Sequence, residues 1–168
     1  MQLLRVLLPL ALAAAALPLA GCEHTYVPYE ARDGGRVLEL GGKKVTVEVA
    51  DKMATRRQGL MGRQSLPPDH GMLFAYPSPR ILGFWMRNTP LALSIAFIEE
   101  LPDGTGRIVN LRDMEPFAEA PTHVSEKPVR LALEMELGWF ARNGIKAGDT
   151  FALPSWVGEL VPGEDSGG

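Results

Sequence analysis

The stretch RVLELGGKKVTVEV, residues 36–49, carries the clearest indication of the fold. Two extended runs, Arg36 to Leu40 and Lys44 to Val49, flank the pair Gly41-Gly42. Valine occupies every other position of the second run, which is typical of a strand with one buried face, and paired glycines suit a tight turn. The stretch therefore predicts a β-hairpin at the start of the folded part.

Downstream of this hairpin, Ala54 to Gly62 is rich in helix-forming residues, with Thr55 as a candidate cap. Pro67-Pro68 prevents the helix from continuing, so we expect a short helix.

Strand-like segments then recur between turn residues and have the lengths of ordinary strands. The candidates are Gly71 to Tyr76, Ile81 to Met86, Leu93 to Glu99, Arg107 to Arg112, Val129 to Glu136 and Thr150 to Leu153. Gly138 to Asn143 is expected to form a second short helical segment, ended by Gly144. The pattern predicts a mainly β fold (a β-rich α+β domain), an antiparallel β-sandwich or a partly closed barrel with one or two short helices.

The first residues have the pattern of an export signal. Arg5 precedes the apolar run Val6 to Leu19, and Leu19-Ala20-Gly21-Cys22 resembles the lipobox, at which a cysteine receives a diacylglyceride before the signal peptide is cut. The apolar run is too short for a bilayer span of roughly 20 residues. We expect residues 1–21 to be a lipoprotein signal peptide and Cys22 to be the lipidation site.

This interpretation sets the organisation and the location of the chain. We expect a flexible tether over residues 22–35, a single globular domain over 36–160, and a disordered tail over 161–168. The lipid on Cys22 would attach the exported protein to a bacterial envelope membrane, with the domain in the periplasm. An ordinary signal peptide with an incidental cysteine is the alternative.

Charge and cysteine content exclude some classes of protein. The 168 residues carry a formal net charge of −3 with both signs interspersed, which argues against nucleic acid as a partner. Cys22 is the only cysteine, so the chain forms no internal disulfide and depends on its hydrophobic core.

Several runs resemble the family called domain of unknown function 192. They are Gly59-Leu-Met-Gly-Arg63, Asp69-His-Gly-Met-Leu-Phe74, Phe84-Trp-Met-Arg-Asn-Thr89, Ile95-Ala-Phe-Ile98, Met114-Glu-Pro116 and Asn143-Gly-Ile-Lys-Ala-Gly-Asp149. The resemblance covers roughly Val45 to Leu153 and implies a compact, mainly β domain without an established activity. Family members usually carry an aspartate where this chain has Ser94, and a lysine where it has Arg87.

One candidate binding site gathers polar residues from these runs. Trp85, Arg87 and Asn88 lie where a strand runs into Pro90, and a large ring beside a cation and an amide can line a pocket. Arg63 and Glu115 are expected to contribute. A purely structural role remains open, with Trp85 covering the core and Asn88 making a turn.

Two acidic residues lie among apolar neighbours. Glu115 and Glu134 are candidates for carboxyls of raised pKa, or for partners of Arg63 or Arg130. As a suitably spaced pair they could act on a glycosidic bond, so an envelope carbohydrate hydrolase is the alternative function.

Metal binding is a weaker alternative. His70 and Met72 carry ligand types that suit Cu(I), but methionines spaced along strands usually fill cores. We expect no metal site and no cofactor. Phosphate loops, nucleophile elbows and zinc-protease helices do not occur in the sequence, which favours a binding domain for a small molecule or an envelope component over an enzyme.

Overall fold

The computed structural model describes residues 35–120 and 122–160. The expected signal peptide, Cys22, nearly all of the expected tether and the tail lie outside these residues. The strands are β1 (Arg36–Leu40), β2 (Lys43–Ala50), β3 (His70–Arg80), β4 (Gly83–Phe84), β5 (Leu93–Glu100), β6 (Thr105–Met114), β7 (His123–Val124), β8 (Val129–Glu136) and β9 (Thr150–Ala152). The helices are α1 (Met53–Gln58), α2 (Trp139–Arg142) and α3 (Ser155–Gly158).

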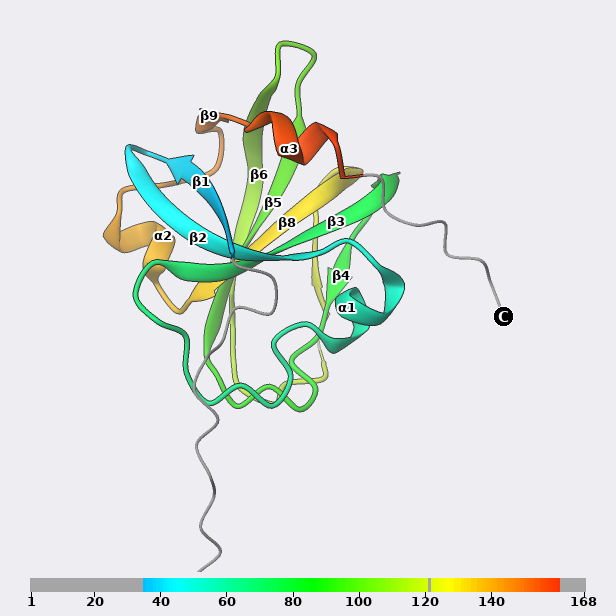
Figure 1. The fold of residues 1–168 in the computed structure, drawn as a ribbon. Helices are drawn as coiled ribbons and strands as arrows, with labels where there is room; N and C mark the ends of the chain where they lie inside the picture. The colour runs from blue at the N-terminus through cyan, green and yellow to red at the C-terminus, as the bar shows by residue number, and fades with distance from the viewer. Residues whose placement is uncertain (1–34, 121, 161–168) are drawn as a thin grey trace, which may run out of the picture.

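Seven strands form one strongly curved sheet in the order β1-β2-β3-β8-β5-β6-β9 (Figure 1). Its two edge strands, β1 and β9, approach each other, so the sheet is nearly closed into a barrel. All neighbours are antiparallel except β2 and β3, which run parallel because the connection through α1 returns the chain to the same end of the sheet. Strands β4 and β7 form a separate two-stranded sheet. The prediction of a mainly β fold is confirmed, and of its two alternatives, a sandwich and a partly closed barrel, the structure has the barrel.

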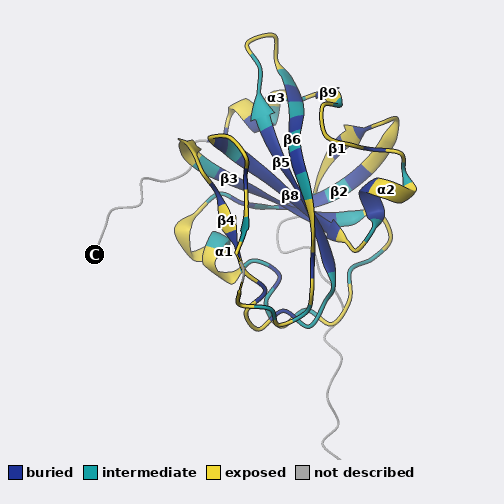
Figure 2. Ribbon diagram, turned by 180° about the vertical axis from the view of Figure 1, so that it is seen from behind, coloured by how far each residue is buried: buried dark blue, intermediate teal, exposed yellow. Residues whose placement is uncertain are grey.

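The curved sheet is buried on both of its faces. On β8, Leu131 and Leu133 point into the inner core, which α2 and α3 close, whereas Ala132 belongs to a second core on the outer face. Figure 2 shows the resulting dark band of buried residues along the central strands. Leu60, Phe84 and Met86 cover the outer face. The second core thus forms between the sheet and the segments carrying α1 and β4.

Most expected elements occur with shifted ends. The hairpin, the short helix and the last strand are present, but only β4 forms within the expected strand Ile81 to Met86. Strand β3 extends to Arg80 past two prolines, with an irregular register before Arg80. We did not predict β7 or α3, which are too short to give a periodic signal. In the described part of the chain, no helix has the length and apolar character needed to cross a bilayer.

Candidate functional site

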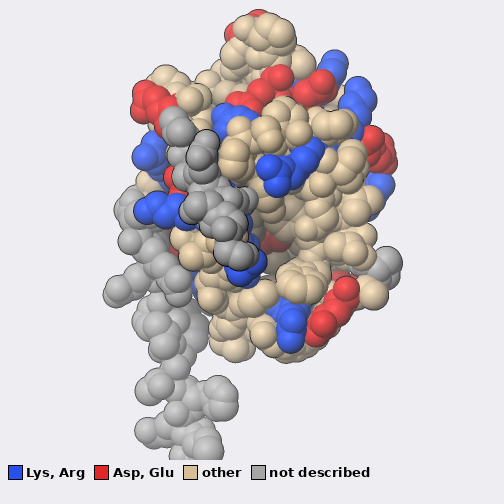
Figure 3. Space-filling model, turned by 90° about the vertical axis from the view of Figure 1, so that its right-hand side faces the viewer, with Lys and Arg blue, Asp and Glu red and all other residues tan. Residues whose placement is uncertain are grey.

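A cavity of about 650 Å³ opens on the outer face of the sheet, between α1 and β4. This volume lies in the range of small-molecule sites. Figure 3 views this side of the molecule, where acidic atoms are visible at depth in a hollow and a few basic side chains lie near its rim. The lining residues are Met53, Arg56, Arg57, Gln58, Gly59, Leu60, Met61, Phe74, Tyr76, Gly83, Phe84, Trp85, Thr89 and Glu134.

Hydrogen bonds from the Arg56 side chain to backbone carbonyls hold α1 against the sheet. The Arg56 guanidinium donates to the carbonyl oxygens of Asp51 and Ala75, at 2.5 and 3.0 Å, and so ties the helix to the end of β2 and to β3. The chain then turns at Gly59, whose φ of 47° favours glycine.

Glu134 is the acidic residue of the cavity. It lies on β8 directly between Met72 of β3 and Ile95 of β5, on the apolar outer face, and only 4% of its surface is exposed. Its carboxyl group takes part in none of the hydrogen bonds or ion pairs of the described residues. Burial alone raises the pKa of this carboxyl to about 8.

Aromatic rings form much of the cavity wall. Phe74 and Phe84 meet edge to face with centroids 4.9 Å apart, and Phe84 also contacts Phe97 of the underlying sheet at 5.8 Å. Trp85 is 50% exposed although it borders the cavity. A half-exposed indole next to a hollow is a surface on which a ligand can stack.

The cavity mouth is basic. The guanidinium of Arg56 lies 4.9 Å from the centre of the Tyr76 ring, and that of Arg80 lies 5.8 Å from the same ring. Arg57 lines the cavity, is exposed, and forms no ion pair with any described residue. The site therefore combines an inner carboxyl, aromatic walls and outer guanidinium groups.

Of the predicted binding residues Trp85, Arg87 and Asn88, only Trp85 lines the cavity. Trp85 borders it, and the exposed Arg87 lies 5.7 Å from the Trp85 ring and 3.9 Å from a carboxylate oxygen of Glu119. Asn88 has a structural part: its φ is 52°, and its carbonyl accepts a 2.8 Å hydrogen bond from the Gly62 N–H. This bond joins the segment after α1 to the segment after β4.

Arg63 and Glu115 do not line the cavity. Arg63 forms a buried ion pair with Glu48 of β2, and Glu115 is exposed after β6. Neither Arg63 nor Arg130 neutralises Glu134, because Arg130 pairs with Glu100. The structure therefore brings Glu134 and Trp85 to one cavity and places Glu115 elsewhere, which gives the paired-acid hypothesis no geometric support.

The two candidate copper ligands also have structural surroundings. A ring nitrogen of His70 lies 2.8 Å from the Pro68 carbonyl oxygen, and Met72 packs in the outer core. Among the described residues, no three His, Cys, Asp or Glu side chains converge as a metal site would require.

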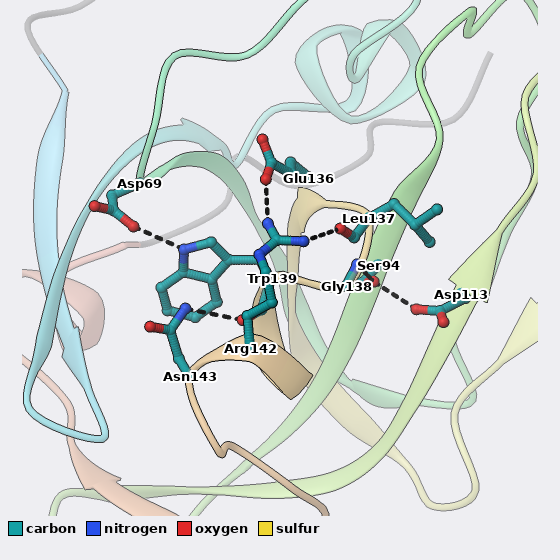
Figure 4. A network of polar contacts seen from close by, with 9 residues as sticks. All are labelled: Asp69, Ser94, Asp113, Glu136, Leu137, Gly138, Trp139, Arg142 and Asn143. Atoms are coloured by element: carbon teal, nitrogen blue, oxygen red, sulfur yellow. Dashed lines mark hydrogen bonds and ion pairs between the residues drawn. The ribbon is translucent and has the colours of Figure 1, made fainter.

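Ser94, where the resemblance implies an aspartate, lies near the start of β5 in a polar network (Figure 4). Its hydroxyl donates to Asp113 at 2.5 Å and accepts from the Gly138 N–H at 2.8 Å. The neighbouring Trp139 indole donates to Asp69 at 2.8 Å. The network fixes the start of α2, so Ser94 has a structural function here.

Sequence reasoning missed part of the cavity. Arg57, Phe74 and Tyr76 line it, but no local pattern distinguishes them from ordinary helix and strand residues. The available signal was the pair Arg56-Arg57 in a short helix; the structure adds that no residue of this helix is buried.

The family model for DUF192, described as "Uncharacterized ACR", matches residues 36–153. The chain belongs to the DUF192 family. The match spans every strand and the whole cavity lining, so the cavity lies within the family's own domain.

Two solved structures are similar to this DUF192 domain. One, from Sinorhizobium meliloti 1021, is provisionally called a transcription regulator; it is 36% identical, has a TM-score of 0.59, and the match covers 69% of this chain and 89% of that one. The other is a protein of unknown function from Novosphingobium aromaticivorans DSM 12444, with 32% identity, a TM-score of 0.59 and coverage of 68% and 81%. No curated protein matches the chain.

Proposed function

We propose that the protein is a lipid-anchored envelope protein whose DUF192 domain binds a small ligand in the cavity between α1 and β4. The observation that carries the binding function is Glu134, a buried carboxyl without a polar partner among the described residues, at a cavity of about 650 Å³. The Glu134 oxygens are not among the fully enclosed, unpartnered atoms of the described residues, so they reach the cavity space, where a donor group of a ligand can take the place of water.

The walls support binding better than catalysis. Glu134 is the one acid among the lining residues, and no three His, Cys, Asp or Glu side chains of the described chain converge as a metal site would require. Half-exposed Trp85 instead offers the flat surface that ligand sites commonly use.

A thermal-shift screen of metabolite-sized compounds tests the binding function. The chain starts at residue 22 and carries Cys22→Ser, so that it is not lipidated. A ligand of the folded state raises the melting temperature. Trp85→Ala should abolish the shift, and Val37→Ala, an equally exposed position away from the cavity, should retain it. A shift that survives Trp85→Ala would argue against this cavity as the site.

The anchor rests on Leu19-Ala20-Gly21-Cys22. Two or three acyl chains on one cysteine give stable membrane attachment, whereas one chain gives marginal binding. Mass spectrometry of the protein expressed in a bacterial host should find an acylated Cys22 at the new N-terminus, and Cys22→Ser should release the protein from membranes. An unmodified thiol at Cys22 in the wild-type chain would contradict this part of the proposal.

A further inference from the structure

The distribution of charge along the cavity specifies the kind of ligand it suits. This inference rests on the proposed binding function and adds the ligand's chemistry to it. Three features carry it: the inner carboxyl of Glu134, the aromatic middle, and the guanidinium groups at the mouth.

The inner carboxyl needs hydrogen-bond donors once it is ionised. Met72 and Ile95, the cross-strand neighbours of Glu134, have no N–H or O–H group in their side chains, so these neighbours supply the carboxyl with no donor. An ammonium group supplies three donors and a charge that a carboxylate attracts strongly where water is excluded.

The middle of the cavity favours an apolar chain next to that ammonium group. Phe74, Phe84 and Trp85 present ring surface, which buries methylene groups at about 0.8 kcal/mol each and attracts cations to the ring faces. A ligand charged along its whole length would lose solvation here without compensation.

The mouth favours the opposite charge. Arg57 lines the cavity, is exposed and has no ionic partner in the described chain, and Arg56 also lines the cavity beside Tyr76. A simple amine would have to pass this basic rim, whereas a ligand with an outer carboxylate is attracted to it.

We infer that the cavity takes an amphiphilic zwitterion, with an ammonium group at Glu134, an apolar chain between the aromatic walls, and an anionic group at Arg57. The simplest members of this class are ω-amino acids, in which a methylene chain separates an amine from a carboxylate. Such ligands place each charge against a residue of opposite charge.

Calorimetric titration can test this assignment with defined probes. The probes are 4-aminobutanoate, 6-aminohexanoate and 8-aminooctanoate, with hexylamine and hexanoate as controls that carry one charge each. At least one ω-amino acid should bind about tenfold or more tighter than both controls, because each control lacks one of the two charge-assisted contacts.

Two variants separate the contributions of the two ends. Glu134→Gln should weaken the ω-amino acid and hexylamine by about tenfold or more and leave hexanoate unchanged. Arg57→Gln should weaken the ω-amino acid and hexanoate, by less because the group is exposed, and leave hexylamine unchanged. Arg36→Gln, on β1 and outside the cavity lining, serves as the matched control and should change none of them.

The pH dependence gives an independent measurement. Because burial raises the pKa of the Glu134 carboxyl to about 8, binding an ammonium group below that pH must release a proton. Affinity for the ω-amino acid should therefore rise as the pH approaches this pKa from below, and the proton release should vanish in Glu134→Gln.

The failure of this inference can be distinguished from failure of the binding function. If uncharged compounds from the screen bind in a manner that depends on Trp85 while no ω-amino acid binds more tightly than hexanoate, the zwitterion is wrong and the binding site stands. If an ω-amino acid binds with equal affinity to wild type and Glu134→Gln, or none binds at millimolar concentration, the assignment is overturned.

Discussion

Arg63 and Glu48 form a buried ion pair that joins the segment after α1 to the central part of β2. The Arg63 Nη2 atom lies 2.8 Å from Oε1 and 2.9 Å from Oε2 of the Glu48 carboxylate. The two side chains are only 15% and 4% exposed. Each charge thus has its partner close by, in contrast to Glu134 on the same sheet. The pair therefore anchors the segment that follows α1 to the sheet, and α1 itself lines the cavity.

Breaking this pair from one side should destabilise the fold strongly. Arg63→Ala leaves the Glu48 charge buried without its partner, which typically costs about 3–5 kcal/mol of unfolding free energy. The double variant Arg63→Met/Glu48→Leu should recover most of the loss. Arg112→Ala, which removes an exposed pair with Glu126, should cost at most about 1 kcal/mol. Urea denaturation measures all three, and a double variant no more stable than Arg63→Ala would contradict the ion-pair explanation.

Stability should fall as pH rises because of Glu134. The pKa of its carboxyl is about 8 when folded and 4.5 by ordinary expectation, so between these values the folded state holds a proton that the unfolded state has lost. The unfolding free energy therefore decreases with pH by up to about 1.4 kcal/mol per pH unit over this range, and the decrease stops above the folded-state pKa. Below the unfolded-state pKa both states are protonated, so the penalty disappears.

Glu134→Gln should remove this component of the pH dependence, because an amide does not titrate. The matched variant Glu115→Gln, at an exposed acid outside the cavity lining, should leave it in place. Denaturant titrations at closely spaced pH values across this range would show the difference between the two variants. Equal slopes in both would mean that Glu134 is ionised and solvated in the folded protein.

Ser94 should not tolerate the aspartate that the family resemblance implies at this position. Ser94→Asp places a second carboxylate beside Asp113 in a buried position, and we expect a loss of about 1–3 kcal/mol at neutral pH. Adding Asp113→Asn should restore much of the stability, since the introduced carboxylate could then accept from both the new amide and the Gly138 N–H. Thermal unfolding of the two variants tests this, and an additive loss in the double variant would argue against charge repulsion.

Gly71 should be intolerant of any side chain. A Cβ atom there would lie 2.2 Å from the Glu134 carbonyl oxygen and 2.4 Å from the Met135 sulfur. Because the first of these atoms belongs to the backbone, Gly71→Ala must separate β3 from β8, at a cost of about 3 kcal/mol or more. Gly158→Ala, in α3 with open space around it, should change stability by less than about 1 kcal/mol. Circular dichroism melts would distinguish the two.

The sequence predicts the strands better than it predicts the site. Alternating valines in β2 and the Gly41-Gly42 turn are local features, and local features survive in any tertiary context that buries one face. Strand β4 was overestimated because Ile81, Trp85 and their neighbours have strand-forming side chains, yet only two residues find a pairing partner, in β7. The pairing partner of β4 lies about 40 residues further along the chain, so the strand propensity of residues 81–86 does not predict which of them will pair.

For the candidate site, the sequence indicated some of the residues that line the cavity, but it did not indicate which residues contact one another. Trp85 and Glu134 stood out as a large ring near a turn and an acid among apolar residues, and both line the cavity. Arg63 stood out equally, but its partner Glu48 turns it into a structural residue. The lipidation of Cys22 and the limits of the tether and tail remain predictions, because they depend on residues outside 35–120 and 122–160.

By itself, the sequence determined the mainly β architecture and the family of the domain, since both depend on patterns of neighbouring residues in the chain, and export with lipidation at Cys22 stays a prediction. Only the tertiary structure decided which acid is buried without a partner among the described residues. Glu134 alternates with apolar residues as a solvent-facing strand residue would, and it becomes a cavity group because α1 and β4 cover the outer face of β8. Burial and charge pairing are properties of segments brought together by folding, and no local pattern contains them.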